Sequence, residues 1–168
     1  MFASFFGRRK SRPDIESQFQ ALVASARTPA FYETDGVPDT MEGRFDLLVA
    51  FVWQAITLHQ SQDERDVAQA LFDRLVDEVE GTLREQGFND KGFAKRMKKL
   101  VAAIYSRFED YAGAVKSDDP KEALARALAQ NIWLSTTPAP GAYNLAEIFL
   151  KNLPDRGAKG LANQQSPA

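Results

Sequence analysis

The sequence contains no cysteine and a single histidine. Without cysteine the chain forms no disulfide bond, which fits a reducing compartment such as the cytosol. A structural zinc site takes four cysteine or histidine ligands, so nearly all sites of that kind are excluded as well. Magnesium or calcium held by carboxylates stays formally open, but we predict no metal site and no cofactor.

Long apolar runs are also lacking. The longest charge-free stretch of the most apolar segment runs from Leu47 to Gln62, which falls short of the ~20 apolar residues that cross a bilayer. The segment from Met1 to Gly7 is too short for the apolar part of a secretory signal, and the positive charges follow it instead of preceding it. We therefore expect the chain to start near Met1 and to stay inside the cell.

Recognisable catalytic motifs are absent. The sequence has no cysteine nucleophile, no G-x-S-x-G elbow, no Walker loop and no G-x-G-x-x-G. Asp73 and Asp77 have the spacing of paired carboxylates, but on an acidic helix such residues usually form a solvated surface. His59 lies at the end of an apolar helix, where the helix dipole stabilises a protonated imidazole. We prefer this structural role to a role as a catalytic residue or ligand. We predict no catalytic residue. The absence of a motif is not the absence of an activity, so an enzyme stays a third and weaker hypothesis.

The formal net charge of −2 hides an uneven distribution. Four basic residues precede the first acidic residue, Asp14, so residues 13–168 carry −6, which is the total less those four positive charges. An acidic body is unsuited to general nucleic-acid binding, whose affinity comes from lysine and arginine on phosphate. We therefore expect no specific nucleic-acid partner.

Residues 1–12 combine aromatic and basic side chains in a pattern typical of segments at an anionic membrane surface. Each basic residue near such a surface contributes ~1 kcal/mol, so we expect reversible attachment and not a permanent anchor. The alternative is an ordinary frayed terminus. The predicted membrane-contact residues are Phe2, Phe5, Phe6, Arg8, Arg9, Lys10 and Arg12.

Apolar residues recur at helical spacing through almost the whole chain, and no strand pattern competes with them. The sequence predicts an all-α fold, a single compact multi-helix domain of about six helices over residues 13–153. A flexible arm at 1–12 precedes this domain, and a disordered tail at 154–168 follows it. The tail offers one large apolar residue, which does not offset the entropy of ordering it.

The helix boundaries follow from capping residues, glycine and proline. Thr28 to Thr40 contains two prolines and a glycine, and we predict a loop pinned by Phe31 and Tyr32. The helix after this loop is apolar nearly all round, which indicates a central position. The predicted helices run from Ile15 to Ala26 after a Ser11 cap, from Met41 to His59, from a Ser61–Glu64 capping box to Gly87, from Asn89 or Gly92 to near Gly113, from Pro120 to Trp133, and from Leu145 to Leu153.

A cluster of five basic residues opens the helix expected after Asn89: Lys91, Lys95, Arg96, Lys98 and Lys99. All except Arg96 lie opposite the apolar stripe of Met97 and Ile104. Positive charge early in a helix is disfavoured by the helix dipole. Residues that are locally unfavourable and bring no evident gain in stability often have a function. The alternative is a solvated face whose charges are paired by acids of the preceding helix: Asp73, Asp77, Glu78 and Glu80.

The segment VPDTMEGRFDLL, from Val37 to Leu48, joins a rigid turn directly to an apolar helix. Pro38 holds the chain extended before the turn, and Thr40 caps the helix that follows. Gly43 permits close packing in the first helical turn. Arg44 stands early in the helix, where the dipole disfavours a cation, so it either pairs with Asp39 or binds an acidic partner.

Together with FNDKGFAKRMKKL, from Phe88 to Leu100, this segment resembles the ubiquinol-cytochrome c chaperone family, whose members help to assemble the cytochrome bc complex. The resemblance covers roughly Phe31 to Leu153. It implies a non-enzymatic assembly chaperone whose client is newly made cytochrome b or an early intermediate of the bc complex, with the ribosome surface as a further contact. Its most specific residues are Pro38, Asp39, Thr40, Gly43, Arg44, Phe45, Leu83, Arg84, Glu85, Lys95, Arg96, Met97, Lys98 and Lys99.

The resemblance and the charge pattern together predict a partner-binding surface. We expect a cytoplasmic protein held peripherally at the inner face of the cytoplasmic membrane. The alternative hypothesis is a helical adaptor that uses the same basic face to bind another protein and has no role in folding a client. The predicted partner-binding residues are Asp39, Arg44, Lys91, Lys95, Arg96, Lys98, Lys99 and Tyr105.

Overall fold

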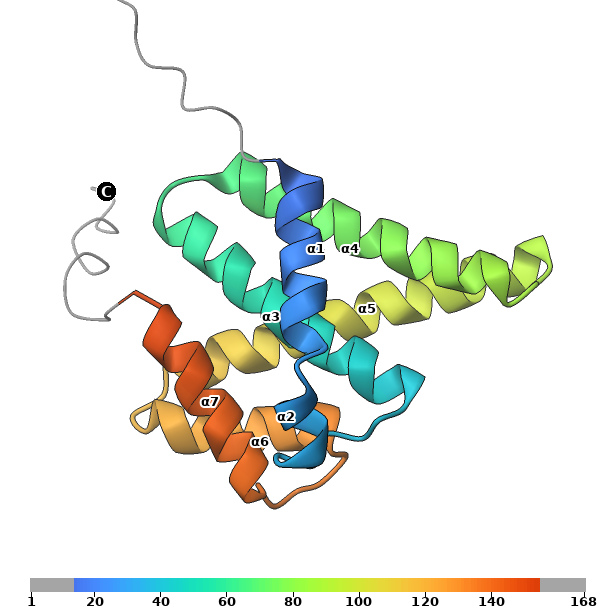
Figure 1. The fold of residues 1–168 in the computed structure, drawn as a ribbon. Coiled ribbons are helices and arrows are strands. Elements are labelled where there is room, and N and C mark those ends of the chain that lie inside the picture. Colours follow the sequence, from blue (N-terminus) through green and yellow to red (C-terminus); the bar gives the residue numbers. More distant parts are fainter. Residues whose placement is uncertain (1–13, 155–168) are drawn as a thin grey trace, which may run out of the picture.

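The computed structural model describes residues 14–154, and this part of the chain forms seven helices and no strand (Figure 1). The predicted all-α fold is therefore confirmed. The predicted arm, and the predicted tail beyond Pro154, lie outside the described residues. The helices are α1 (Ile15–Ala26), α2 (Pro29–Glu33), α3 (Met41–Ser61), α4 (Arg65–Glu85), α5 (Asp90–Val115), α6 (Pro120–Ile132) and α7 (Pro140–Asn152).

α3, α5 and α6 each start at a side-chain cap, and two of these caps, Thr40 and Asn89, were predicted. Thr40 Oγ1 accepts a hydrogen bond from the Gly43 N–H group over 3.0 Å and starts α3. Asn89 Oδ1 accepts one from the Gly92 N–H group over 2.8 Å and starts α5. The Asp119 side chain caps α6 in the same way. Each cap satisfies a backbone donor that the first turn of a helix leaves without an intrahelical partner.

Two predicted caps are wrong. The cap of α1 is Asp14 and not Ser11, since the Asp14 carboxylate accepts from backbone N–H groups of the first turn. The capping box of Ser61 and Glu64 does not form, because Ser61 is still the last residue of α3 and Glu64 makes no side-chain cap. The Ser61 hydroxyl instead donates to Leu58 O at 2.6 Å, a local bond that competes with capping.

A five-residue helix, α2, interrupts the segment that we predicted as a loop. Pro29 lies in its first turn, where a missing N–H group costs no hydrogen bond. Phe31 is buried, and the Tyr32 hydroxyl donates to Ala26 O at 2.6 Å, so the predicted pinning by two aromatics is confirmed. A helix of little more than one turn is too short to show a periodic pattern in the sequence.

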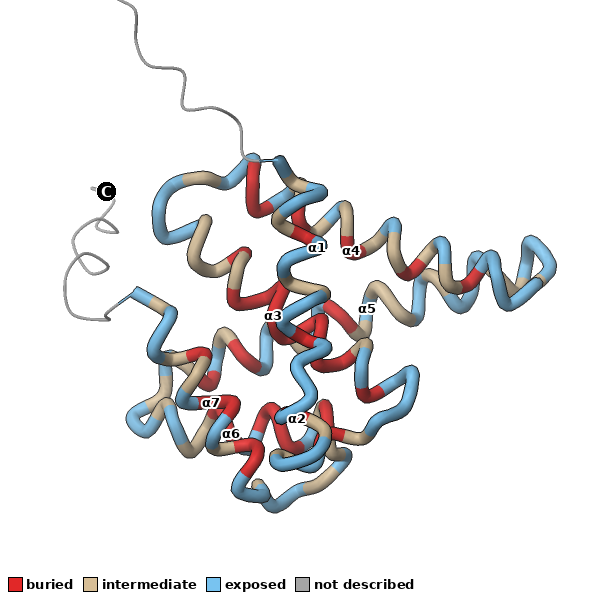
Figure 2. The backbone as a smooth tube through the Cα atoms, in the orientation of Figure 1, coloured by how far each residue is buried: buried red, intermediate tan, exposed pale blue. Residues whose placement is uncertain are grey.

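α3 passes through the centre of the described chain and is contacted by α1, α4, α5, α6 and α7. Its middle is buried almost continuously (Figure 2), which confirms the predicted central position. Phe51 contacts Phe149 of α7 with 5.1 Å between ring centroids, and Trp53 contacts Tyr111 of α5 at 5.2 Å. The Gln54 side chain is also buried, and its amide group donates a hydrogen bond to Phe149 O over 3.1 Å. This polar group therefore has a partner inside the core.

α4 and α5 form an antiparallel hairpin whose tip, at residues 86–89, projects from the helical body (Figure 1). α6 and α7 pack against each other, and α6 also packs against α5. The projecting part of the hairpin is therefore covered on fewer sides than α3. Among residues 14–154, no helix is both long enough and apolar enough to cross a membrane.

Two glycines allow the segment between α1 and α3 to press closely against helices. A Cβ atom on Gly43 would lie 2.1 Å from Pro38 O, and one on Gly141 would lie 2.0 Å from Asp35 O. Non-bonded atoms in a packed interior do not approach so closely. Glycine is therefore required at both points, and the predicted role of Gly43 in close packing is confirmed.

The Gly43→Ala variant should be destabilised by about 3 kcal/mol or more, because the new methyl group has to displace a backbone carbonyl. Gly81→Ala on α4 is the matched control, since nothing lies within 4 Å of its added Cβ atom. Alanine at an exposed helical position should stabilise by about 0.5 to 1 kcal/mol. Urea unfolding measures both changes, and equal stability of the two variants would contradict the close approach.

Candidate partner-binding groove

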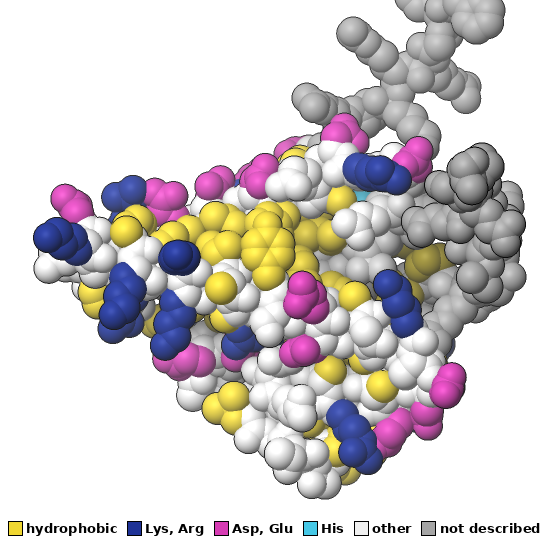
Figure 3. Space-filling model, turned by 180° about the vertical axis from the view of Figure 1, so that it is seen from behind, with side chains coloured by type: hydrophobic (Ala, Val, Ile, Leu, Met, Phe, Trp, Pro, Cys, Tyr) yellow, Lys and Arg dark blue, Asp and Glu magenta, His cyan; other side chains and the backbone are white. Residues whose placement is uncertain are grey.

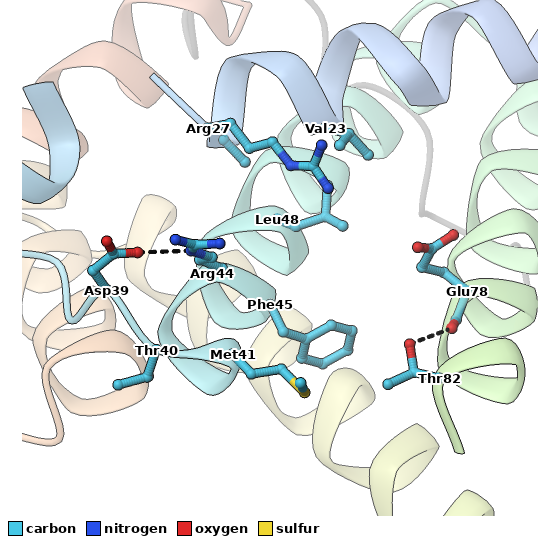
Figure 4. A pocket seen from close by; sticks show the side chains of 11 residues that line it. Val23, Arg27, Asp39, Thr40, Met41, Arg44, Phe45, Leu48, Glu78 and Thr82 are labelled. Atoms are coloured by element: carbon cyan, nitrogen blue, oxygen red, sulfur yellow. Dashed lines mark hydrogen bonds and ion pairs between the residues drawn. The ribbon is translucent and has the colours of Figure 1, made fainter. Parts of the chain in front are cut away.

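A hollow of about 490 Å³ opens between the end of α1, the start of α3 and the middle of α4. Val23 of α1 and Phe45 and Leu48 of α3 line it with apolar side chains, and Glu78 and Thr82 face them from α4 (Figure 4). Phe45 and Val23 are only half-buried, so part of their apolar surface is open to a ligand. The site is concave and apolar with polar groups at its edges, as binding sites commonly are.

The hollow continues past Phe45 towards α5 as a second hollow of about 220 Å³. Met41, Phe45 and Thr82 line both, so the two form one continuous depression. We call it the α3 groove, because the first turns of α3 lie along its length. Its lining includes Val23, Arg27, Asp39, Met41, Arg44, Phe45, Leu48, Thr82, Leu83, Arg96 and Leu100.

The first residue of α3 is the most exposed apolar side chain of the groove. The Thr40 cap and the contact of Gly43 with Pro38 fix where α3 begins. Met41 therefore points beyond the core and is 65% exposed. Methionine is flexible and polarisable, so it adapts to apolar partners of different shape. An exposed methionine beside a half-buried phenylalanine favours a binding function for this end of α3.

Arginine side chains stand at three points round the α3 groove. Arg44 donates its Nε–H group to Asp39 Oδ1 over 2.7 Å, which confirms the internal pairing that the sequence allowed. Both side chains of this pair are 60% exposed, so water competes strongly with the bond and a partner can replace either group. Arg27 and Arg96 have no carboxylate partner among residues 14–154, and Arg96 stacks on the Phe88 ring at 4.2 Å.

Two of the carboxylates at the groove are already neutralised by arginine. Asp39 is bound by Arg44, and Glu78 accepts from Arg74 at 2.9 Å. Glu42, another lining residue, stands in the first turn of α3, where a negative charge suits the helix dipole. The guanidinium groups at the two ends of the groove are thus the charges most available to a partner.

A buried ion pair holds the start of α3 to α5 behind the groove. Arg107 Nη2 lies 2.8 Å from Asp46 Oδ1, and the two side chains are only 20% and 10% exposed. Burial is the largest effect on the Asp46 carboxyl and raises its pKa to about 6. The charge of Arg107 lowers this pKa, and the charge of Glu42 raises it. The carboxylate is therefore retained at neutral pH against a desolvation penalty, with Arg107 as its compensating charge.

The stability of the protein should fall as pH rises through about 6, because folded Asp46 holds a proton that the unfolded chain has lost. This contribution is fully present below the ordinary aspartate pKa of about 4 and amounts to on the order of 3 kcal/mol. Asp46→Asn should remove that fall, since an amide oxygen still accepts from Arg107 without titrating. Urea unfolding between pH 4 and 8 measures this fall in the free energy of unfolding, and the exposed Asp73→Asn variant is the control.

The structure divides the predicted partner-binding residues between two surfaces. Asp39, Arg44 and Arg96 line the α3 groove. The remaining five lie on the outer side of α5, away from the groove: Lys91, Lys95, Lys98, Lys99 and Tyr105. The separation of Arg96 from the lysines agrees with its predicted place outside their arc.

The acids of α4 do not pair with these lysines. Glu78 pairs with Arg74, and Glu80 pairs with Arg84 at 2.6 Å, both within α4. No lysine of the cluster lies within ion-pair distance of a carboxylate in the part of the chain that the structure describes. The expected pairing with the acids of the preceding helix is therefore not seen in residues 14–154, and the alternative of a solvated face stays a prediction.

Sequence reasoning missed several groove residues. We named Phe45 among the residues that carry the family resemblance but not among the partner-binding residues, and gave Arg27 and Met41 no functional role. Met41 had a usable signal, because the residue directly after a helix cap is in the first turn and often lies outside the core. Asp46, which lies behind the groove, also had a usable signal, because it is a single acidic residue inside the apolar run FDLLVAFVW.

His59 has a structural role, as predicted in preference to a ligand role. Its Nδ1 lies 2.8 Å from Glu64 Oε2, and its Nε2 lies 3.1 Å from Gln18 Nε2, so it links α1 to the end of α3. No group of three or more metal-ligating side chains occurs within residues 14–154. The predicted membrane-contact residues, Phe2 to Arg12, lie outside the described residues.

Comparison with known proteins bears on the whole helical region. A family model described as Ubiquinol-cytochrome C chaperone matches residues 33–154. A structure described as the crystal structure of the Cbp3 homolog from Brucella abortus is 33% identical to this chain and superposes with a TM-score of 0.71. That match covers 81% of this chain and 76% of the Brucella chain. No curated protein matches the chain.

Proposed function

Because the chain belongs to the ubiquinol-cytochrome C chaperone family, we propose that it acts without catalysis on newly made cytochrome b during assembly of the cytochrome bc complex. The family is the one that the sequence resemblance predicted. The α3 groove is the proposed docking site for this client. The observation that carries the docking site is the exposed Met41 beside Phe45, in a groove that ends at Arg96. The Arg96 guanidinium stacks on Phe88 and has no carboxylate partner among residues 14–154.

The size of the groove limits what part of a client it holds. A membrane-spanning helix is ~30 Å long and ~10 Å wide, which corresponds to on the order of 2,000 Å³. The two hollows, at about 490 and about 220 Å³, are far smaller. The groove therefore receives one or two apolar side chains of cytochrome b and does not enclose a spanning helix. A segment outside the bilayer is the better ligand.

The charges round the groove define that segment further. Arg27 and Arg96 stand at opposite ends, and Arg44 can exchange Asp39 for another carboxylate. Hydrogen bonds between guanidinium and carboxylate groups are stronger than neutral ones and often bidentate. The proposed ligand is thus a short stretch of cytochrome b in which apolar side chains are flanked by acids.

We place this activity at the inner face of the cytoplasmic membrane. The support is the composition of residues 1–12, whose phenylalanines and basic side chains suit an anionic surface. Contact with the ribosome surface is a further proposal, and it rests on the resemblance to the family alone. Each of these contacts is a separate proposal, and its failure would leave the docking proposal unchanged.

The double variant Met41→Asp with Arg96→Glu should fold normally, since an acid in the first turn of α3 suits the helix dipole. It should bind cytochrome b about tenfold less tightly or worse, because it places two negative charges against an acidic ligand. In cells lacking the intact gene it should fail to restore spectroscopic cytochrome b and quinol-cytochrome c reductase activity.

The matched control is Leu134→Asp with Lys116→Glu, which makes the same kinds of change at exposed positions away from the groove. It should restore both signals fully. Normal cytochrome b with the Met41 and Arg96 variant would remove the groove from the proposal, and normal cytochrome b in the gene deletion would end the chaperone function. Recovery of a soluble protein in place of cytochrome b on co-purification would identify an adaptor instead.

A further inference from the structure

The outer side of the α4–α5 hairpin carries an apolar band that no other described helix covers. Two phenylalanines and one tyrosine form its centre: the Phe72 ring lies 4.8 Å from Tyr105 and 6.1 Å from Phe108, between centroids. Tyr105 is 52% exposed. The band, here called the hairpin face, consists of Phe72, Val76, Met97, Val101, Tyr105 and Phe108.

Opposite charges border the two long edges of the hairpin face. Figure 3 shows the apolar band with acidic side chains along one edge and basic side chains along the other towards the hairpin tip. The acidic edge comes from α4 and includes Asp73, Asp77 and Glu80. The basic edge comes from α5 and includes Lys91 and Lys98, which have no ion-pair partner among residues 14–154.

We propose that the hairpin face packs against the hairpin face of a second copy of this chain, so that α4 and α5 of both copies form a symmetric four-helix bundle. A two-fold axis parallel to the helices places the acidic edge of each copy over the basic edge of the other. An axis perpendicular to the helices would oppose acid to acid and base to base. Charge thus selects one of the two symmetric arrangements.

The contact between Phe72 and Tyr105 fixes which charges meet. Because α4 and α5 are antiparallel, moving seven residues from this contact towards the tip brings Lys98 level with Val79, between Asp77 and Glu80. A two-fold axis parallel to the helices leaves each residue at the same height along the helices in both copies. Lys98 of each copy therefore faces Asp77 of the other, twice in every dimer, whereas Glu80 is already paired with Arg84 of its own helix.

The area of the hairpin face is sufficient for a dimer of modest affinity. A helix of 21 residues, the length of α4, is ~30 Å long, and two packed helices are ~20 Å wide. The footprint is about 600 Å² per copy, or about 1,200 Å² in total, at the lower end of the range for specific interfaces. Tyr105 at the centre of the band is the expected main contributor, since tyrosine is enriched among such residues.

An anionic membrane is a poorer occupant than a second copy. Its headgroups would attract the lysines, but Asp73 and Asp77 border the same face and would repel them. A second copy satisfies both edges at once. The inference does not depend on the proposed function, because the α3 groove and the hairpin face share no lining residue.

Sedimentation equilibrium of the full chain over a wide concentration range tests the dimer. The intact protein should dimerise reversibly, and Lys98→Glu and Asp77→Lys should each weaken the dimer about tenfold or more through repeated like-charge contacts. Mixing the two variants should restore dimerisation, because position 98 of each copy then faces a charge of opposite sign at position 77 of the other. Lys99→Glu is the matched control, since the next residue is turned ~100° further round α5.

A monomer at every concentration would overturn the proposal. So would a dimer that tolerates both charge reversals, or single variants that do not recover on mixing. If the intact monomer instead binds vesicles of anionic phospholipid and Lys98→Glu does not, the hairpin face contacts a membrane and the dimer is excluded. Thermal unfolding of each variant shows that loss of the dimer does not reflect loss of the fold.

Discussion

α3 is apolar on nearly every side, and the arrangement of the other helices follows from the need to cover it. Helices α1, α4, α5, α6 and α7 contact α3, and Phe31 of α2 adds a ring contact with Phe51. Aromatic side chains from α5 and α7 pack along the middle of α3. Coverage is less complete at its first turns, because the segment before α3 crosses over Gly43 and leaves Met41 outside. The same constraint that builds the core thus leaves an apolar groove at the end of its central helix.

Two polar side chains interrupt this core and attach α3 to its neighbours. Gln54 reaches the backbone of α7, and Asp46 pairs with Arg107 of α5. The second of these links is kept against desolvation, as the raised pKa of Asp46 shows. It holds α5 beside the first turns of α3, and Arg96 of the same helix then closes one end of the groove.

Most of the helices were predictable because their causes are local: apolar spacing, the caps Thr40 and Asn89, and Pro120 in the first turn of α6. The sequence analysis missed α2 and placed the start of the last helix at Leu145, whereas α7 begins at Pro140. The pairing of Arg44 with Asp39 was one of two alternatives that a separation of five residues allowed. The groove was not predictable, since Met41 and Arg96 lie on different helices and only packing brings them to one depression. The Asp46–Arg107 pair is non-local in the same way. The domain limits at 13 and 153 stay a prediction from sequence.

Site-specific photo-crosslinking from position 41 during pulse-labelled synthesis of cytochrome b tests the proposed docking directly. Met41 is 65% exposed, so a photoreactive side chain fits there without disturbing the core. Position 134, where Leu134 is 85% exposed at a distance from the groove, supplies the control. Docking at the α3 groove predicts a strong crosslink to new cytochrome b from position 41 and none from position 134. Equal crosslinking from both positions, or none from position 41, would contradict it.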